Sequence, residues 1–294
     1  MKKCLLFLLL IPFTMYSQEK LDTLKTWKVG GMISLNFSQV SITNWAAGGR
    51  SSNAGVGIFN IFGIYKKDNL LWENSLDMGY GVIKEENRHS VKSDDRIDLN
   101  SKLGIKKTEK LYYSALFNFK TQFAPGYKDP NYEDAISRFL SPGYVTLSLG
   151  LDYKPNKAWS IFVSPLTGKM TIVTDDVLSA QGAFGVDPGK TIRTEVGSFV
   201  KVELKTGLMK NVSLNSKLDL FSSYTNNPEN IDVNWDVLIN MKINDYLSAV
   251  LITNMIYDDD IKIAIDDNND GVIEKRGPRL QFKEIFGVGF NLKF

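Results

Sequence analysis

The chain has 294 residues, of which 35 are basic and 33 acidic, and its single cysteine is Cys4. Charges so nearly balanced provide no basic surplus for nucleic-acid binding, and one cysteine cannot form an intrachain disulfide. Charged residues interrupt every apolar stretch after the first few residues, which argues against a membrane-spanning helix. A soluble protein or a membrane β-barrel remains.

The first seventeen residues have the layout of a secretory signal peptide. Lys2 and Lys3 precede an apolar run over residues 4–13, which is too short for a spanning helix, and small and polar residues follow. We therefore predict a signal peptide over residues 1–17 and a short periplasmic segment over residues 18–26. Because cleavage would remove Lys2 and Lys3, the mature chain would be formally neutral.

From Trp27 onward the repeating feature is alternation of apolar and polar residues. Leu70, Trp72, Leu76, Met78 and Tyr80, for example, alternate with Glu73, Asp77 and Gly79. Successive side chains of a strand point to opposite faces, so one face is apolar and the other is polar or small. The pattern predicts about twelve strands, near residues 28–40, 54–66, 70–84, 95–106, 111–123, 143–154, 159–171, 194–206, 212–224, 231–243, 246–257 and 280–294.

Strand length and loop length together predict the architecture. The expected strands are about twice the usual five or six residues, and long enough for a tilted strand that crosses a bilayer. Short connections such as 66–69, 107–110 and 244–245 alternate with long ones such as 124–142 and 172–193. We therefore predict an all-β fold over residues 27–294: a single antiparallel transmembrane β-barrel of about 12 strands. Short turns would face the periplasm, longer loops the exterior, and the location would be the outer membrane.

The end of the chain gives a further signal. Phe286, Val288, Phe290, Leu292 and Phe294 alternate up to a terminal aromatic residue. Such an ending resembles the signal by which barrels are handed to their insertion machinery, although an ordinary last strand could also end in phenylalanine. The expected partners are therefore outer-membrane lipid and the insertion machinery; nucleic acid is not expected, and the sequence names no other protein partner.

Three segments carry a family resemblance. They are WKVGGMISLNFSQVSITNWAAGG at 27–49, NSLDMGYG at 74–81 and GPRLQFKEIFGVGFNLKF at 277–294. They resemble a family of Bacteroidetes proteins of unknown function whose members are thought to be outer-membrane barrels. The resemblance covers nearly all of the mature chain. It implies the fold and the location, and no particular activity.

The last long loop contains a calcium-loop pattern. Oxygen donors with the spacing of such a loop are Asp266, Asn268, Asp270, the carbonyl of Val272, and Glu274. The pattern then departs from the consensus, because Gly277 stands where a bidentate glutamate is expected. Two interpretations stay open: a weak calcium site, or a solvated turn-rich loop. No other cofactor is indicated.

Two other loop features bear on function. His89, the single histidine, adjoins Ser90, and a lipid hydrolase would use such a pair. However, adjacent side chains diverge on a strand and no Gly-x-Ser-x-Gly motif is present, so we predict no catalytic residue. The apolar loop from Asn44 to Gly49 would plug the lumen, touch a partner, or rest on the barrel rim.

The predicted lumen face carries charges of both signs. The residues are Arg96, Lys102, Lys120, Lys217 and Lys242, and Glu73, Asp77, Asp98, Asp152, Asp219 and Asp236. So balanced an interior favours cross-linking by ion pairs over a strongly ion-selective pore. The leading hypothesis is a narrow channel for small solutes or a structural envelope component. The alternatives are an enzyme acting on lipid or lipopolysaccharide, and a subunit of a larger envelope complex.

Overall fold

The computed structural model describes residues 26–42, 50–128, 131–265 and 274–294. The predicted signal peptide, residues 18–25 and the apolar loop from Asn44 to Gly49 lie outside the described residues. The predicted division of the chain at residues 17 and 26 therefore stays a prediction.

Twelve antiparallel strands form one closed barrel, as the alternation predicts. Each strand pairs with its neighbour in sequence, and the last closes against the first. The largest difference from the predicted ranges at a strand's start is that β4 begins at Val91 rather than at residue 95. The strands are β1 (Trp27–Val40), β2 (Ser52–Lys67), β3 (Leu70–Glu85), β4 (Val91–Lys106), β5 (Leu111–Thr121), β8 (Gly143–Tyr153), β9 (Trp159–Ile172), β10 (Ile192–Met209), β11 (Val212–Ser223), β12 (Asp232–Lys242), β13 (Leu247–Tyr257) and β16 (Gln281–Lys293).

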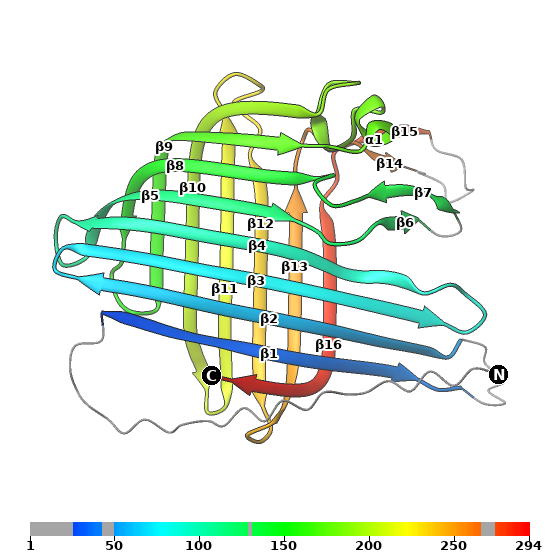
Figure 1. The fold of residues 1–294 in the computed structure, drawn as a ribbon, viewed down its shortest axis with the longest axis horizontal. Helices are drawn as coiled ribbons and strands as arrows, with labels where there is room; N and C mark the ends of the chain where they lie inside the picture. The colour runs from blue at the N-terminus through cyan, green and yellow to red at the C-terminus, as the bar shows by residue number, and fades with distance from the viewer. Residues whose placement is uncertain (1–25, 43–49, 129–130, 266–273) are drawn as a thin grey trace, which may run out of the picture.

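The two ends of the barrel differ, also as predicted. One end carries short turns, and we call it the turn end. The other, the loop end, carries the long connections and the small elements within them (Figure 1). These elements are β6 (Gly126–Lys128), β7 (Asn131–Ser137), α1 (Asp176–Ala180), the 3-10 turn η1 (Ala183–Gly185), β14 (Ile263–Ile265) and β15 (Lys275–Gly277).

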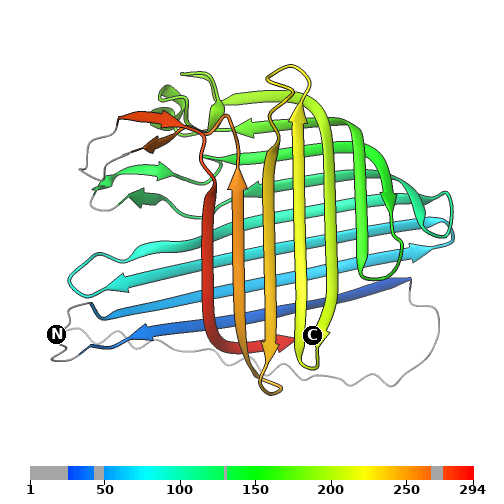
Figure 2. The same cartoon turned by 180° about the vertical axis from the view of Figure 1, so that it is seen from behind.

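The barrel has two walls whose strands run in different directions. Strands β1–β5, β8 and β9 form the front wall in Figure 1, and β10–β13 with β16 form the rear wall, seen from behind in Figure 2. The strands of the two walls cross steeply. Side chains on the two inner faces therefore meet across the lumen although they are far apart in the sequence.

The seam that closes the barrel is short. Strand β1 pairs with β2 along its whole length but with β16 only from Met32 to Phe37. Beyond that ladder the Gly31 N–H donates to the Phe294 carbonyl at 2.9 Å, and the Phe294 N–H donates to the Gly31 carbonyl at 3.1 Å. The ring of Phe294 fills the space that a Cβ on Gly31 would need. The terminal aromatic residue is thus part of the closure.

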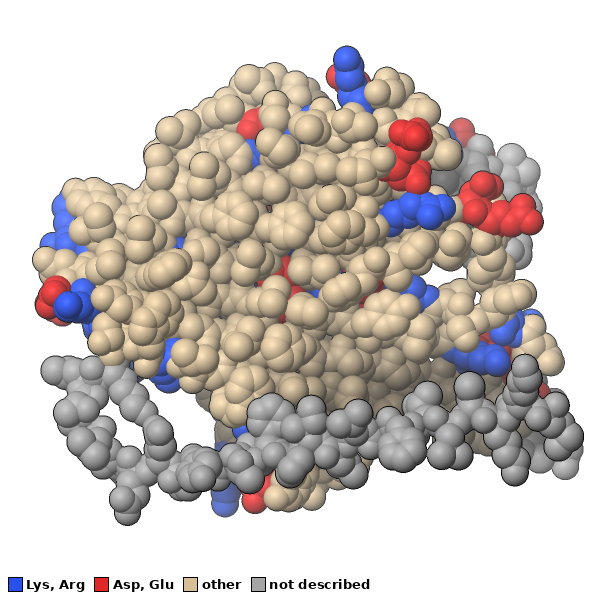
Figure 3. All heavy atoms as spheres, viewed as in Figure 1, with Lys and Arg blue, Asp and Glu red and all other residues tan. Residues whose placement is uncertain are grey.

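The outer face of the barrel is apolar. Exposed side chains include Val29, Ile33, Leu35, Phe37, Leu147, Leu149, Phe282, Phe286, Phe290 and Leu292. In Figure 3 the visible face has a broad uncharged band, and the charged side chains gather toward its ends. The barrel strands have 11 to 18 residues, and about 9–11 residues suffice to cross a bilayer at a tilt. A closed barrel with such a band faces lipid with its exterior.

No helix in the described part of the chain is long and apolar enough to cross a membrane.

Candidate functional site

The loop-end half of the lumen contains a cavity of about 620 Å³. Its walls are inner-face side chains of both barrel walls, and Ser137, Phe184 and Ile261 of the loop-end connections also line it. The charged lining residues are Asp94, Asp95, Asp98, Asp219, Asp232, Asp236 and Asp258, with Arg96, Lys120, Lys169 and Lys283. Its size lies within the usual range of small-molecule sites, roughly 300–1,000 Å³. Because acids outnumber bases in the lining, its potential is negative.

Most of these charges are used in ion pairs that join the two walls. Lys120 of the front wall donates to Asp219 of the rear wall at 3.1 Å, and Lys169 donates to Asp232 at 2.6 Å. Lys283 of β16 pairs with Asp94 of β4. Pairs between opposite walls hold the lumen at a fixed width, since each tie requires both side chains to reach across it.

Three charged groups of the lining are not paired in this way. Among the described residues, no ion pair joins Asp98, Asp236 or Arg96 to an opposite charge within 4.0 Å. Asp98 instead accepts hydrogen bonds from the Asn100 and Asn118 side-chain amides at 2.9 and 2.6 Å. Asp236 accepts one from Asn254 at 2.5 Å. The amides orient these carboxylates and leave their negative charge in place.

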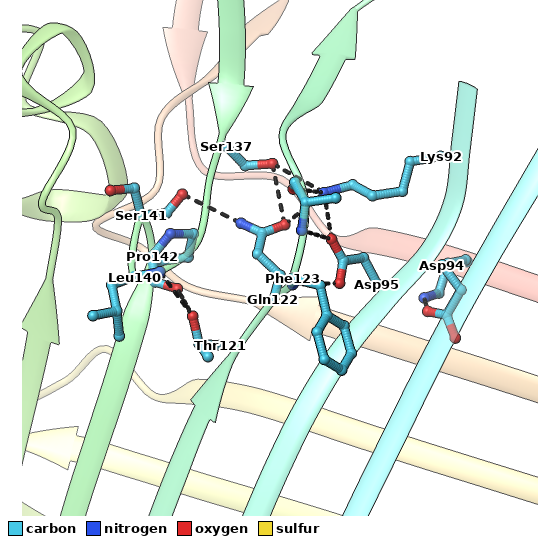
Figure 4. A network of polar contacts seen from close by, with 12 residues as sticks. Lys92, Asp94, Asp95, Thr121, Gln122, Phe123, Ser137, Leu140, Ser141 and Pro142 are labelled. Carbon is cyan, nitrogen blue, oxygen red and sulfur yellow. Dashed lines mark hydrogen bonds and ion pairs between the residues drawn. The ribbon is translucent and has the colours of Figure 1, made fainter. Parts of the chain in front are cut away.

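The rim of the cavity is anchored by Lys92, as Figure 4 shows. Its ammonium group donates to Asp95 at 2.9 Å, to Gln122 at 2.8 Å and to the Ala124 carbonyl at 2.8 Å. Asp95 also accepts from the backbone N–H groups at the start of the β5–β8 connection. The side chain of Gln122 accepts from Ser137 of β7 at 3.1 Å. This network ties the β6–β7 hairpin to the barrel wall.

A second anchor lies at Arg193, near the start of β10. Its guanidinium donates to the Gly185 carbonyl at 2.9 Å and pairs with Glu195 at 2.9 Å and Asp260 at 2.7 Å. It therefore joins the connection that contains η1 to the connection that follows β13. Both anchors hold loop-end segments beside the cavity.

The floor of the cavity is aromatic. Phe199 and Phe221 line it and pack with Leu116 and Phe162 in one buried cluster. The Phe162 and Phe199 ring centres are 6.4 Å apart, and only 1% of Phe162 is exposed. The four side chains come from β5, β9, β10 and β11 and cover the inner face of the barrel there.

The turn-end half has a polar network on its front wall. Lys102 of β4 contacts Asp152 of β8 at 2.9 Å and donates to Ser160 of β9 at 2.8 Å. Lys154 pairs with Glu73 at 2.8 Å. A smaller cavity of about 360 Å³ lies in this half, beside Lys205, Asn215, Leu238 and Asn240. Its lining shares no residue with that of the large cavity.

The predicted interior ion pairs are largely confirmed. Lys102, Lys120 and Lys217 pair with Asp152, Asp219 and Asp77 respectively, the last at 2.7 Å. The prediction is wrong for Lys242. That residue ends β12, and its ammonium group pairs with Asp245 of the adjacent turn at 2.5 Å instead of crossing the lumen.

The residues of the other hypotheses are not brought together with these groups. His89 and Ser90 are exposed in the β3–β4 connection, where the His89 ring lies 4.8 Å from that of Tyr132. Of the calcium-loop donors, Asp266, Asn268, Asp270 and Val272 lie outside the described residues, and Glu274 is exposed. Among the residues that are described, no group of three or more His, Cys, Asp or Glu side chains is placed to hold a metal ion.

Sequence analysis missed the aromatic floor and the loop anchors. A signal for the floor exists: Phe199 and Phe221 occupy alternate positions with Lys201 and Asp219, which are on the polar face. An aromatic residue on the polar face of a barrel strand points into the lumen. The anchors had no such signal, since Lys92 and Arg193 appear as ordinary charges near loops.

The closed strand order and the apolar outer face define this chain as an outer-membrane β-barrel. Residues 37–127 match the model of a family described as a protein of unknown function, DUF3078. The resemblance to a family of unknown function is confirmed to that extent. No curated protein matches the sequence.

Several solved structures are similar to the chain. The COG4313 outer membrane channel from Pseudomonas putida F1 is 15% identical, with 94% of this chain and 100% of that chain covered and a TM-score of 0.41. The translocator domain of autotransporter NalP from Neisseria meningitidis is 9% identical, with 92% and 89% covered and a TM-score of 0.37. A Pseudomonas aeruginosa FadL homologue is 9% identical, with 91% of this chain and 88% of that chain covered and a TM-score of 0.31.

Proposed function

We propose that the barrel is a narrow channel for small solutes in the outer membrane. The observation that carries this proposal is that the lumen contains a cavity in each half, and that Phe199 and Phe221, which line the loop-end cavity, belong to the aromatic cluster around Phe162. The loop-end cavity would be the external entrance and the cluster the constriction. Solutes would then pass only when side chains of the cluster move aside.

The charges of the lumen support a low conductance. Cross-lumen pairs such as Lys120–Asp219 and Lys217–Asp77 occupy space that an open porin leaves to water. A barrel of twelve strands lies between small filled barrels and wide porins of about 16–18 strands. Small solutes are therefore the only class that such a path would admit.

Single-channel recording in a planar bilayer tests the proposal. We expect the wild-type barrel to give small discrete current steps. Phe162→Ala removes the most buried ring of the constriction and should enlarge the steps. Phe290→Ala is the matched control, because Phe290 lies on the lipid-facing side and is 62% exposed. It should conduct like the wild type.

Silence would contradict the channel. If the wild type and Phe162→Ala are both folded and both silent, the barrel is not a solute path, and the structural role in the envelope is favoured. Folding is checked by the shift in gel mobility that barrels show when heated in SDS.

The route to the membrane is part of the proposal. We propose a Bacteroidetes source, export with loss of residues 1–17, and insertion by the barrel machinery through the last strand. Support for the last step comes from Phe294, which alternates with Leu292 and Phe290 and meets Gly31 at the seam.

A further inference from the structure

The charges left unpaired in the loop-end cavity point to the chemistry of a ligand. Most of its basic and acidic groups balance one another in ion pairs, as described above. Arg96, Asp98 and Asp236 are the described lining residues that form none. These three groups determine which solutes the cavity can bind, because a charge that already forms an ion pair across the lumen interacts less strongly with a solute.

Arg96 is held without a partner. It lies on the inner face of β4, and its Nε is a buried atom with no hydrogen-bond partner. The carboxylates of Asp94, Asp236, Asp77 and Asp98 surround it and interact with its charge, and none of them is within ion-pair distance. A guanidinium has five N–H donors in a planar fork, which fits the two oxygens of a carboxylate. Leaving such donors unused inside a protein is costly.

Asp236 faces Arg96 from the opposite wall. Strands β4 and β12 lie on opposite sides of the ring of strands, so a solute between them can touch both groups. The carboxylate of Asp236 is oriented by the Asn254 amide, and that of Asp98 by Asn100 and Asn118. Carboxylates fixed by neutral amides retain the charge that an ammonium group needs as a partner.

We propose that this cavity binds a zwitterionic solute of the amino-acid type. Its carboxylate would pair with Arg96, its ammonium group with Asp236 and Asp98, and its apolar part would rest on Phe199 and Phe221. The surplus of aspartates repels a simple anion, and a simple cation leaves the Arg96 donors unused. A solute that carries both charges satisfies both sides. The claim that such solutes pass through the channel rests on the proposed function. Binding to the cavity can be measured independently of it.

Calorimetric titration of the full-length barrel in detergent tests the site with three probes. These are L-phenylalanine, L-phenylalaninamide, which lacks the anion, and N-acetyl-L-phenylalanine, which lacks the cation. We expect phenylalanine to bind at least about tenfold more tightly than either analogue, because each analogue loses a charge-assisted pair.

Variants assign the two ends of the ligand. Arg96→Gln should abolish the preference for phenylalanine over its amide, and Asp236→Asn should abolish the preference over the N-acetyl form. Arg50→Gln makes the same substitution outside the cavity, where Arg50 lies 3.7 Å from Glu85, and should bind like the wild type. The heat-dependent gel shift verifies that each variant is folded, and if Arg96→Gln does not fold, Asp236→Asn and the wild-type preferences decide.

Two results would overturn the inference: a wild type that binds the three probes equally or not at all, or a folded Arg96→Gln variant that keeps the full preference for phenylalanine over its amide. The recording experiment keeps the two proposals apart. If the barrel conducts without binding phenylalanine, the channel proposal stands and the binding site is refuted. If it binds phenylalanine without conducting, the binding site stands and the channel is refuted.

Discussion

The two halves of the lumen are held by ion pairs of different kinds. Around the loop-end cavity, Lys120–Asp219 and Lys169–Asp232 join opposite walls. In the turn-end half, Lys102 of β4 and Asp152 of β8 pair within the front wall, across β5. The first half encloses the large cavity, and the second encloses the smaller one. The larger cavity therefore lies where ion pairs span the lumen from wall to wall.

Glycines allow β1 and β16 to approach each other closely at the seam. Gly287 and Gly289 lie on the inner face of β16, where that strand meets β1. A Cβ on Gly289 would lie 2.0 Å from the Leu35 carbonyl oxygen and 2.6 Å from the Asn36 Cα. The two backbones can approach this closely only because no side chain separates them.

The largest expected effect comes from Gly289→Val. Because the added atoms meet backbone, β1 and β16 would have to separate at a seam that is already short. We expect the barrel not to close, so that the heat-dependent gel shift is lost. Gly168→Val on β9 is the matched control, since nothing lies within 4 Å of its Cβ position. Normal folding of Gly289→Val would show that closure of the barrel does not depend on this close approach of β1 and β16.

A smaller effect on stability is expected from the cross-lumen ion pair between Lys217 and Asp77. Lys217 and Asp77 are 2.7 Å apart, and their side chains are 14% and 19% exposed. Lys217→Met would leave Asp77 without its paired charge and should lower the free energy of unfolding by about 3 kcal/mol. The double variant Lys217→Met/Asp77→Leu should lose less, since no unpaired charge remains.

Urea unfolding of the vesicle-inserted barrel, followed by tryptophan fluorescence, measures both variants. If the double variant loses at least as much stability as Lys217→Met alone, the pair does not tie the walls, and the contrast between the halves has another cause.

Much of the fold could be predicted from the sequence, because a bilayer imposes a period of two on every strand and a minimum strand length. Leu70 to Val82 shows this directly, and the structure places that segment within β3. Polarity also predicted that Lys120 and Lys217 face the lumen. Their partners could not be predicted, since Asp219 and Asp77 depend on how the two walls cross. For the same reason, the sequence around Arg96 could not predict that this residue forms no ion pair.

The smallest effect is expected at the turns, where ion pairs are solvated. Lys106 and Glu109 are 2.6 Å apart beside the β4–β5 turn, and the Glu109 side chain is 88% exposed. The hydrogen bond from Lys106, together with its charge, lowers the pKa of Glu109. Any stability from this pair is therefore present above the pKa of the unfolded chain and is lost as the pH falls through the folded value. Water and salt screen so exposed a pair, so Glu109→Gln should leave the urea midpoint unchanged at neutral pH.

A clear loss of stability in this variant, comparable to that of Lys217→Met, would mean that the distance between the charges alone sets the strength of these pairs. The contrast between lumen and turns would then have no energetic basis.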